Sequence, residues 1–558
     1  MPSQGPTPRI RQAGDAALLL DVTDTDDQEG NGPARFAAAI RAAALPGVTD
    51  VVPAARTVLV TVEPGSWELD DLAGQLREVG RAPAPPLPAS DQPDLVIPAV
   101  YDGPDLEEVA ALTKLSETEV IARHARSRYR VGWLGFSPGF GYLTGLHPSL
   151  AAVPRLATPR VFVPAGSVAV AGGLAAVYPA ASPGGWRLLG RTNVLLWDPG
   201  RDPPALLAPG RHVRFRIVDR LPPPVAEASR PARPAGERWI EVLQSGPLTT
   251  VQDLGRPGGA HLGVPRSGAA DAASLRRANR LAGNPDEAAG LEVTLGGLVL
   301  RFEADAVVAV TGAPVTLTLP AGDTGGTGPP ESGASPAGTV SARGAVAGPD
   351  PVHGTAFAVA AGSVLRLGVP ATGLRSYLSV NGGIDVAPVL GSRSADLRSG
   401  LGPARLRPGE RLPVGRPRSR IENPMPERPR PVLTGSVVLR VIAGPRDDWF
   451  SAAALAALGT ARYQVSTASD RTGLRLSGPA LRRARGRISE LPSEGVAAGS
   501  LQVTHDGQPI LLLADHPTTG GYPVIAVVAS DDLGLAGQLR PGEQVQFSVS
   551  PSQLASSR

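Results

Sequence analysis

VPAGSVAVAGG (Val163–Gly173) and VAAGSLQVTHDG (Val496–Gly507) share one sequence pattern, although they lie far apart in the chain. Each stretch leads to a pair of glycines before an aromatic residue, in SPGGW (Ser182–Trp186) and in TTGGY (Thr518–Tyr522). The order and the approximate spacing of these motifs agree. Chance similarity in a chain rich in Gly and Pro is the simpler alternative, but several matches in one order favour a repeated structural unit.

Both copies then reach a Pro-Gly turn and an alternating strand, in LAPGRHVRF (Leu207–Phe215) and in LRPGEQVQF (Leu539–Phe547). LRPGERLPV (Leu406–Val414) is a weaker third copy. Short alternating strands joined by Gly and Pro turns are typical of β-barrels. The repeat therefore predicts barrel-like units in which the strand after the Pro-Gly turn closes the barrel.

Three Pro-rich stretches divide the chain, at Ala82–Asp94, Pro222–Gly236 and Pro413–Pro431. Such stretches neither pair in a sheet nor continue a helix, so we interpret them as linkers. A Gly/Ser/Pro stretch at Ala321–Gly354 is interpreted as a loop inserted in a domain, because strand-like segments flank it. The expected domains are 1–81, 95–219, 237–412 and 432–552.

The first 81 residues alternate between strand and helix patterns, which predicts a small α/β sandwich. Further along, Asp105 is placed to begin a helix, and Ser116 with Glu119 fits the capping box of another. Elsewhere short strands and turns dominate, so the expected fold is mainly β with α/β parts. The expected strands are 15–22 and 57–64, and the expected helices are 33–45, 66–80, 106–113, 270–282 and 449–458.

The composition excludes several chemistries. The 558 residues include no cysteine, which excludes disulfides, thiolate metal sites and a Cys nucleophile. Lys114 is the only lysine, so a Walker A loop is excluded and a Schiff-base mechanism is disfavoured. Although Gly and Pro number 67 and 59, 42% of the residues are hydrophobic, which is typical of a folded chain with many turns. No spacing of His, Asp and Glu predicts a metal site.

Charge and hydropathy argue against nucleic-acid and membrane partners. Lys and Arg together number 54 and Asp and Glu 51, a formal net charge of +3. This near balance gives no reason to expect nucleic-acid binding. The N-terminal MPSQGPTPRIRQAG lacks an apolar signal core, and no long apolar run is free of Pro, Gly or charge. We therefore expect a cytoplasmic protein.

Longer motifs carry a family resemblance. RHARSRYRVGWLGFSPGFGYLTGL (123–146) resembles the allophanate hydrolase subunit 1 family, which includes the B-type subunit of 5-oxoprolinase. LTTVQDLGRPGGAHLGVPRSGAAD (248–271) and SEGVAAGSLQV (493–503) resemble the subunit 2 family, which includes the C-type subunit of 5-oxoprolinase. The chain thus resembles both subunits fused through Pro222–Gly236, and it is similar to the carboxyltransferase region of urea amidolyase. The resemblance implies cyclophilin-like β-barrel domains.

The resemblance also implies a function. A fused B and C component would act with a separate A-type subunit in an ATP-dependent 5-oxoprolinase, which converts 5-oxo-L-proline, a small cyclic amide, to L-glutamate. ATP with Mg²⁺ would enter through that complex. The alternatives are the carboxyltransferase component of a biotin-dependent urea or amide carboxylase and a non-catalytic regulator of a histidine kinase. Lys114 lacks a biotin-acceptor hairpin, so no covalent biotin is expected on this chain. A homo-oligomer is left open.

Three side chains are the catalytic candidates. His124 is selected as a general base or as a ligand for an acyl oxyanion, because histidine titrates near neutral pH, and a structural cap at the helix end is the equal alternative. Asp271 and Asp396 are selected as carboxylates near Gly-rich turns. For Asp271, capping of the following helix is the strong alternative.

The substrate-binding candidates are arginines, which pair with carboxylates, and groups around the glycine turns, whose N–H groups can bind anionic oxygens. Glycine pairs also permit close backbone approach and positive φ, and a plain tight turn is the alternative. Together the candidates outline a cleft between the repeated barrels. They are Arg160, Ser167, Gly184, Gly185, Arg191, Arg256, Arg471, Gln502, Gly520, Gly521 and Tyr522.

Overall fold

The computed structural model describes residues 8–22, 32–81, 87, 92–223, 238–319, 351–417, 436–487 and 491–550. Most of the three Pro-rich stretches and of the expected insertion lie outside these residues. Pro413 and Val414 are exceptions, because they end the edge strand β23 (Arg411–Val414) and so do not belong to a linker. Proline is tolerated there because an edge strand has one unpaired side.

The N-terminal unit is a four-stranded antiparallel sheet in the order β1-β2-β4-β3, with two helices on one face. Alternation along β4 sends Val58 and Val60 toward the helices and Leu59 to the opposite face. The expected small α/β unit is confirmed. Its elements are β1 (Arg9–Gln12), β2 (Ala17–Asp21), α1 (Gly32–Ala43), β3 (Val48–Pro53), β4 (Thr57–Val62) and α2 (Leu69–Arg81).

The first barrel is a seven-stranded sheet in the order β12-β9-β10-β7-β6-β13-β5. Val100 and Arg191 exchange backbone hydrogen bonds of 2.9 and 2.8 Å, which join the two end strands. The expected capping box of Ser116 and Glu119 begins α4. The elements are β5 (Leu95–Ala99), α3 (Leu106–Thr113), α4 (Glu117–Arg126), β6 (Tyr129–Leu134), β7 (Gly141–Thr144), β8 (Arg160–Val163), β9 (Ser167–Ala171), β10 (Leu174–Val177), β11 (Ser182–Gly184), β12 (Arg187–Arg191) and β13 (His212–Ile217).

The middle unit stacks two five-stranded sheets around one apolar core, with α5 on the outer side of the second sheet. The sheet orders are β19-β21-β17-β14-β23 and β15-β16-β22-β18-β20. The elements before β23 are β14 (Arg238–Ser245), β15 (Leu248–Gln252), α5 (Ala272–Ala282), β16 (Gly290–Thr294), β17 (Leu298–Phe302), β18 (Ala306–Gly312), β19 (Leu317–Thr318), β20 (Ala356–Val359), β21 (Val364–Leu367) and β22 (Arg375–Val380).

The second barrel is closed, in the order β24-β31-β28-β29-β26-β25-β32. Its core gathers apolar side chains from the strands and from α6. The elements are β24 (Val437–Ala443), α6 (Ala452–Thr460), β25 (Arg462–Val465), β26 (Gly473–Ser477), β27 (Glu494–Gly495), β28 (Ser500–Val503), β29 (Pro509–Leu512), β30 (Thr519–Gly520), β31 (Val524–Val528), α7 (Leu533–Ala536) and β32 (Gln544–Ser550).

The two barrels repeat one topology, which confirms the sequence repeat. In each, the first strand pairs in parallel with the last, β5 with β13 and β24 with β32. At the two Pro-Gly turns Gly210 and Gly542 take φ of +90° and +89°, which glycine adopts without steric cost. The weaker third copy differs, since β23 runs antiparallel to β14. The cyclophilin-like type of barrel and the four domain boundaries stay predictions.

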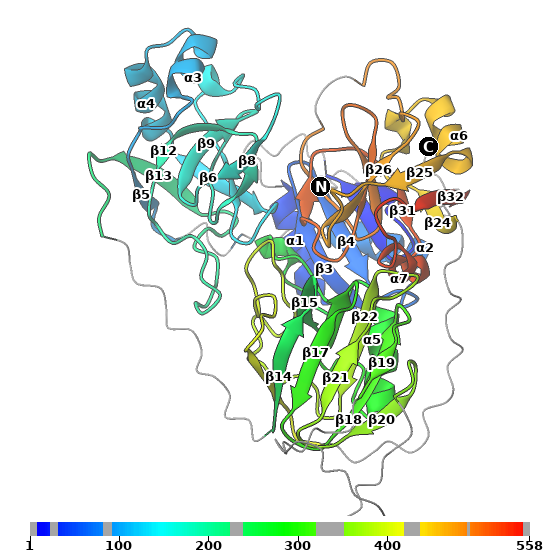
Figure 1. Cartoon of the computed structure of the whole chain (residues 1–558). Coiled ribbons are helices and arrows are strands. Elements are labelled where there is room, and N and C mark those ends of the chain that lie inside the picture. Colours follow the sequence, from blue (N-terminus) through cyan, green and yellow to red (C-terminus); the bar gives the residue numbers. More distant parts are fainter. Residues whose placement is uncertain are drawn as a thin grey trace, which may run out of the picture.

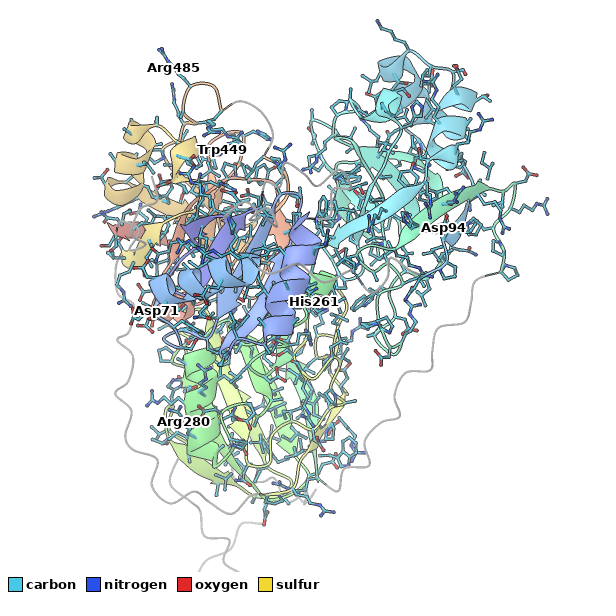
Figure 2. The ribbon with its side chains drawn as sticks, turned by 180° about the vertical axis from the view of Figure 1, so that it is seen from behind. Asp71, Asp94, His261, Arg280, Trp449 and Arg485 are labelled. Atoms are coloured by element: carbon cyan, nitrogen blue, oxygen red, sulfur yellow. The ribbon has the colours of Figure 1, made fainter. Side chains whose placement is uncertain are left out.

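The N-terminal unit lies against the second barrel and the middle unit, although the first barrel follows it in sequence (Figure 1). The carboxylate of Asp15 accepts hydrogen bonds from the N–H and hydroxyl of Ser530. On the other side, Asp50 accepts one of 2.9 Å from the N–H of Ala260. In the view from behind, His261, the residue after Ala260, lies beside helix α1 of the N-terminal unit (Figure 2). No helix in the described part of the chain is long and apolar enough to cross a membrane.

Candidate functional site

The candidate site is the junction at which loops of the first barrel, the middle unit and the second barrel meet. The loop after β6 carries Phe136, whose N–H donates to Oγ1 of Thr519 in the second barrel over 3.0 Å. In the same loop the N–H of Gly139 donates to the carbonyl of Leu262 in the middle unit over 2.9 Å. This loop therefore ties the three units together at one place.

Asp253 organises the middle-unit side of the junction. Its Oδ1 accepts hydrogen bonds from the N–H of Gly255 over 2.8 Å and from the hydroxyl of Ser392 over 2.6 Å. Its Oδ2 accepts one of 2.6 Å from the N–H of Arg393. The hydroxyl of Ser394 also bonds to this carboxylate. Two segments distant in sequence, QDLGR (252–256) and GSRSAD (391–396), are thereby held as one pair of loops.

Arg256 lies buried beside these loops. Its Nη2 donates to the carbonyl of Ser394, while Nη1 is buried without a hydrogen-bond partner among the described residues. Burial lowers the pKa of Arg256, and the charges of Asp396 and Asp253 oppose this shift. A buried N–H of a cation without an acceptor is costly, so it is a good donor for a ligand oxygen.

Arg471 forms the second-barrel side and is fully committed to protein acceptors. It donates to both oxygens of Asp515, over 2.8 and 3.0 Å, and to Glu292 over 2.5 Å. Burial raises the pKa of Asp515 against the effect of Arg471. For Glu292, burial acts in the same direction, but Arg471 and Arg375 outweigh it and lower the pKa. This cluster joins the second barrel to the middle unit.

Arg398 is a second cation with free donors at this junction. Its guanidinium makes no hydrogen bond or ion pair with the residues that the structure describes, and its Cζ lies 5.2 Å from the ring centroid of Phe136. Burial lowers the pKa of Arg398, and the charges of Asp396, Asp470 and Asp515 oppose this. A half-buried guanidinium stacked on an aromatic ring can bind a carboxylate or a carbonyl oxygen.

His516 lies close enough to Arg398 for their charges to interact. Its Nδ1 is 2.8 Å from the carbonyl oxygen of Pro517. Burial, and then the charge of Arg398, lowers the pKa of His516, so the imidazole is neutral near pH 7. A neutral histidine beside a cation can accept or share a proton during reaction at a bound amide.

Two positions at the junction that are not glycine have left-handed backbone. Phe136 has φ +66°, and Ser267, whose N–H donates to the carbonyl of Ala514, has φ +54°. Such conformations cost about 1–3 kcal/mol and persist only where the surroundings fix them. Ala44, Lys114, Leu295 and Leu390 also have positive φ, so this strain alone does not select the junction.

The paired glycines sit in two short ribbons, β8 with β11 and β27 with β30. None of Gly184, Gly185, Gly520 and Gly521 has positive φ. The prediction that these pairs are glycine because the backbone needs positive φ is therefore wrong. Close approach is the reason at Gly520, because a Cβ there would lie 2.5 Å from Nε2 of Gln502. A Cβ on Gly184 would likewise collide with the hydroxyl of Tyr178. Anion binding by these glycines stays a prediction.

His124 lies in the apolar core of the first barrel and not at the junction. It is 0% exposed, its Nδ1 is 2.7 Å from the hydroxyl of Tyr101, and its ring packs 4.7 Å from that of Phe215. Burial lowers its pKa to about 3. The structure therefore does not bring His124 together with the other candidates.

Asp271 and Asp396 have different surroundings. Asp271 caps α5, accepting hydrogen bonds from the N–H of Ser274 over 3.2 Å and from Nε2 of Gln538 over 3.0 Å. Asp396 lies at the junction, where its Oδ1 accepts a 3.0 Å hydrogen bond from the N–H of Arg398. Asp396 thus shapes the turn that presents Arg398, and Asp271 supports the interface behind it.

Three candidates on the first barrel are paired locally. Arg160 donates to Asp105 over 2.6 Å, and Arg191 donates to Asp102 over 2.9 Å at the surface. The hydroxyl of Ser167 donates to a backbone carbonyl of its own turn over 2.8 Å. These three do not reach the junction.

In the second barrel, Nε2 of Gln502 donates to the carbonyl of Tyr522 over 3.2 Å, which holds the TTGGY segment in place. Sequence reasoning missed four residues of the junction: Phe136, Arg398, Asp515 and His516. Their only signal was a position inside or beside the long motifs, since no charge pattern or spacing singles them out.

Comparisons with known proteins agree with this architecture. Residues 8–207 match the model of the carboxyltransferase domain, subdomain C and D, and residues 262–549 match that of the carboxyltransferase domain, subdomain A and B. The C subunit of the 5-oxoprolinase of Escherichia coli (strain K12) is 37% identical over 311 residues, which covers 55% of this chain and 90% of that protein. The B subunit from Escherichia coli O157:H7 is 43% identical over 177 residues, 31% of this chain and 78% of that protein.

Two further similarities extend the comparison. A urea amidolyase of Lachancea kluyveri is 30% identical over 333 residues, 55% of this chain but 17% of that protein. A crystal structure of the protein TTHA0988 superposes with a TM-score of 0.80 at 35% identity, covering 96% of this chain and 99% of that one.

The fold and the two matched models define a carboxyltransferase-domain protein that carries both pairs of subdomains in one polypeptide. The chain belongs to the family of the B and C subunits of 5-oxoprolinase, to which urea amidolyase is related. Its N-terminal part is B-like and its C-terminal part is C-like, as the sequence motifs indicated.

Proposed function

We propose that this chain is the fused B and C component of an ATP-dependent 5-oxoprolinase and that it acts with a separate A-type subunit. The observation that carries the proposal is the junction, where Phe136 from the B-like first barrel meets Arg398 and Thr519 from the C-like part. A site built from both parts needs both, and relatives of the two parts are subunits of one enzyme.

The chemistry of the junction suits a small amide that bears a carboxylate. The reaction consumes 5-oxo-L-proline, ATP and two waters, one to open the lactam C–N bond and one to cleave the phosphoanhydride, and it yields L-glutamate, ADP and phosphate. The free donors of Arg398 and the Nη1 of Arg256 can hold the carboxylate or the lactam oxygen. The neutral imidazole of His516 is placed to move a proton. ATP with Mg²⁺ enters as a substrate of the complex.

Reconstitution tests this proposal. The purified chain is mixed with an A-type subunit of 5-oxoprolinase from the same organism, and phosphate release is measured with and without 5-oxo-L-proline. We expect 5-oxoproline-dependent ATP hydrolysis only when both proteins are present. The variant Arg301→Gln, which alters an exposed ion pair with Glu241, serves as a control and should leave the rate unchanged. Absence of stimulation over either protein alone would sink the proposal.

A second candidate is a carboxyltransferase that receives a carboxyl group from a biotin carrier and passes it to the nitrogen of urea or another amide. The names of the matched domain models and the urea amidolyase relative favour it. Lys114, the only lysine, ends α3 in a left-handed turn, so the biotin would be carried by another protein. A streptavidin-reactive protein should then co-purify with the chain, and its absence would count against this candidate.

A further inference from the structure

The ribbon formed by β8 and β11 on the first barrel carries an exposed apolar pair. Val161 is 89% exposed and Phe162 is 64% exposed. The two strands pair only with each other among the described strands, so no third strand covers them. Large apolar side chains that stand exposed together mark interaction surfaces more often than single ones do.

The second barrel contains the equivalent ribbon, formed by β27 and β30. Opposite the first glycine of each glycine pair stands a charged residue, Arg160 in the first ribbon and Glu494 in the second. Each of these residues has an ion-pair partner, and the signs are exchanged: Arg160 pairs with Asp105, and Glu494 pairs with Arg446. Asp105 and Arg446 occupy equivalent positions in the two barrels. The N–H of each donates a 3.1 Å hydrogen bond to the penultimate strand of its own barrel, β12 or β31.

The ribbons differ at one place. A register shift gives the first ribbon an extra residue, so Val161 and Phe162 stand where the second ribbon has Gly495 alone. The first barrel therefore presents large apolar side chains at the position where the second barrel has none.

In the second barrel this position is a docking surface within the chain. Gly495 packs against Leu59 of the N-terminal sheet, and a Cβ on the glycine would lie 2.5 Å from the Cβ of Leu59. Next to it, the N–H of Ala55 donates to the carbonyl of Ser493 over 3.1 Å. The equivalent ribbon is thus covered by the apolar face of a small sheet.

We propose that the β8–β11 ribbon docks a separate protein subunit through an apolar sheet face of that subunit, as the β27–β30 ribbon docks the N-terminal sheet. Taking this partner to be the A-type subunit rests on the proposed function. Val161 and Phe162 supply the apolar contact that Leu59 supplies at the second ribbon.

A second copy of the chain cannot cover the ribbon in this way. The face of the N-terminal sheet that would be needed contains Leu19, Val52 and Leu59, which are 1–2% exposed because they already pack against the rest of their own chain. The occupant is therefore a different polypeptide.

The ribbon is also close to the candidate site. A Cβ on Gly521 of the TTGGY segment would lie 3.3 Å from Nη1 of Arg155, which precedes β8 on the first barrel. Figure 1 shows β8 on the side of the first barrel that is turned toward the second barrel. A protein docked there would stand beside the junction, where a phosphorylated or otherwise activated substrate can pass between proteins without release.

The test uses the full chain and the purified A-type subunit. The variants Val161→Asp and Phe162→Asp place a charge on the ribbon, and Val369→Asp is the matched control, because Val369 is 71% exposed on the middle unit. Dissociation constants are measured by titration calorimetry, with thermal unfolding as a check on folding. We expect each ribbon variant to raise the dissociation constant at least about tenfold, while Val369→Asp leaves it unchanged.

Each outcome decides a different point. If the wild type binds and is active while the ribbon variants bind equally well, the docking inference is wrong and the proposed function stands. If the ribbon variants lose binding, and the wild-type complex shows no 5-oxoproline-dependent ATP hydrolysis, the docking inference stands and the proposed function is wrong. If the wild type does not bind the A-type protein, both fall. Concentration-dependent dimers abolished by Val161→Asp would assign the ribbon to a second copy and overturn the stated partner.

Discussion

Replacement of Arg471 by methionine measures how far buried charge holds the second barrel to the middle unit. The side chain of Arg471 is 5% exposed, and it pairs with Asp515 and Glu292, whose side chains are 3% and 1% exposed. Methionine fills much of the same volume but donates no hydrogen bond. Asp515 would then stay buried without this cation, while Glu292 would keep only Arg375, whose Nε lies 3.4 Å from its Oε1.

The expected loss follows from these contacts. Removing one partner of a buried ion pair costs about 3–5 kcal/mol, because an uncompensated charge remains. For a unit of this size, such a loss lowers the melting temperature by roughly 6–20 °C. The control is Arg301→Met, which breaks a 2.8 Å pair with Glu241 in which the side chains are 47% and 29% exposed. Exposed pairs of this kind are worth about 0.2–1 kcal/mol.

The pH dependence gives a second criterion. Burial already raises the pKa of Asp515, and Arg471 contributes to the lowered pKa of Glu292. Without Arg471 both pKa values should rise. A folded state with raised carboxyl pKa values binds more protons than the unfolded state, so its stability increases as the pH falls. The deficit of Arg471→Met should therefore be largest at neutral pH and shrink toward pH 5.

Thermal unfolding of the wild type and both variants at pH 5, 6 and 7.5 provides the measurement, with each transition followed separately because the chain has several units. The reasoning is refuted if Arg471→Met and Arg301→Met lose the same stability, or if the deficit of Arg471→Met grows on acidification.

Three further predictions concern single residues. Because burial lowers the pKa of His124 to about 3, this residue alone should contribute a loss of about 2 kcal/mol of unfolding free energy between pH 7 and pH 5, as the unfolded state takes up the proton; His124→Leu should make the loss over this range smaller by that amount in denaturant titrations, and an unchanged pH slope would contradict it. Arg398→Gln should raise the KM for 5-oxoproline in the reconstituted enzyme without lowering the melting temperature, and the converse result would make it a structural residue. Gly263→Ala should lower the melting temperature by displacing the loop of Phe136, because Gly263 has φ +79° and a Cβ there would collide with the carbonyl of Ser137, at a cost of about 1–3 kcal/mol; unchanged stability would contradict it.

Local signals were sufficient for much of the fold. The capping box of Ser116 and Glu119 and the cap by Asp271 each involve residues three apart, so the pattern is visible in the sequence. The barrel repeat was visible because Pro-Gly turns fix glycine at positive φ in both copies. The barrel closure itself, with its parallel first and last strands, is a long-range pairing that no local pattern specifies.

The candidate site was visible only in part, because its contacts are between distant segments. Arg256 and Asp396 lie at the junction, as the motifs suggested, but the partner of Arg398 is Phe136 from another unit. His124 illustrates the opposite case. A histidine at the end of a helix has the same sequence whether its ring faces solvent or the core, and here it faces the core.

The way the N-terminal unit packs explains why the two parts of the chain depend on each other. By sequence this unit belongs with the first barrel, since one family model spans residues 8–207. By packing it belongs with the second barrel, where Arg446 bonds to Asp21 of β2 over 2.5 Å and also to Glu494. Arg446 and Glu494 are 6% and 7% exposed, and buried charges are tolerated only when they are paired.

The pair of Arg446 with Glu494 lies within the C-like part, whereas its pair with Asp21 exists only while the B-like and C-like parts are together. In the two Escherichia coli relatives these parts are separate subunits, B and C. Joining them in one chain makes the contact intramolecular and raises the effective concentration of each part for the other. The junction of Phe136, Arg398 and Thr519 then forms as a consequence of folding, while the ribbon at Val161 and Phe162 stays exposed, as the docking proposal requires.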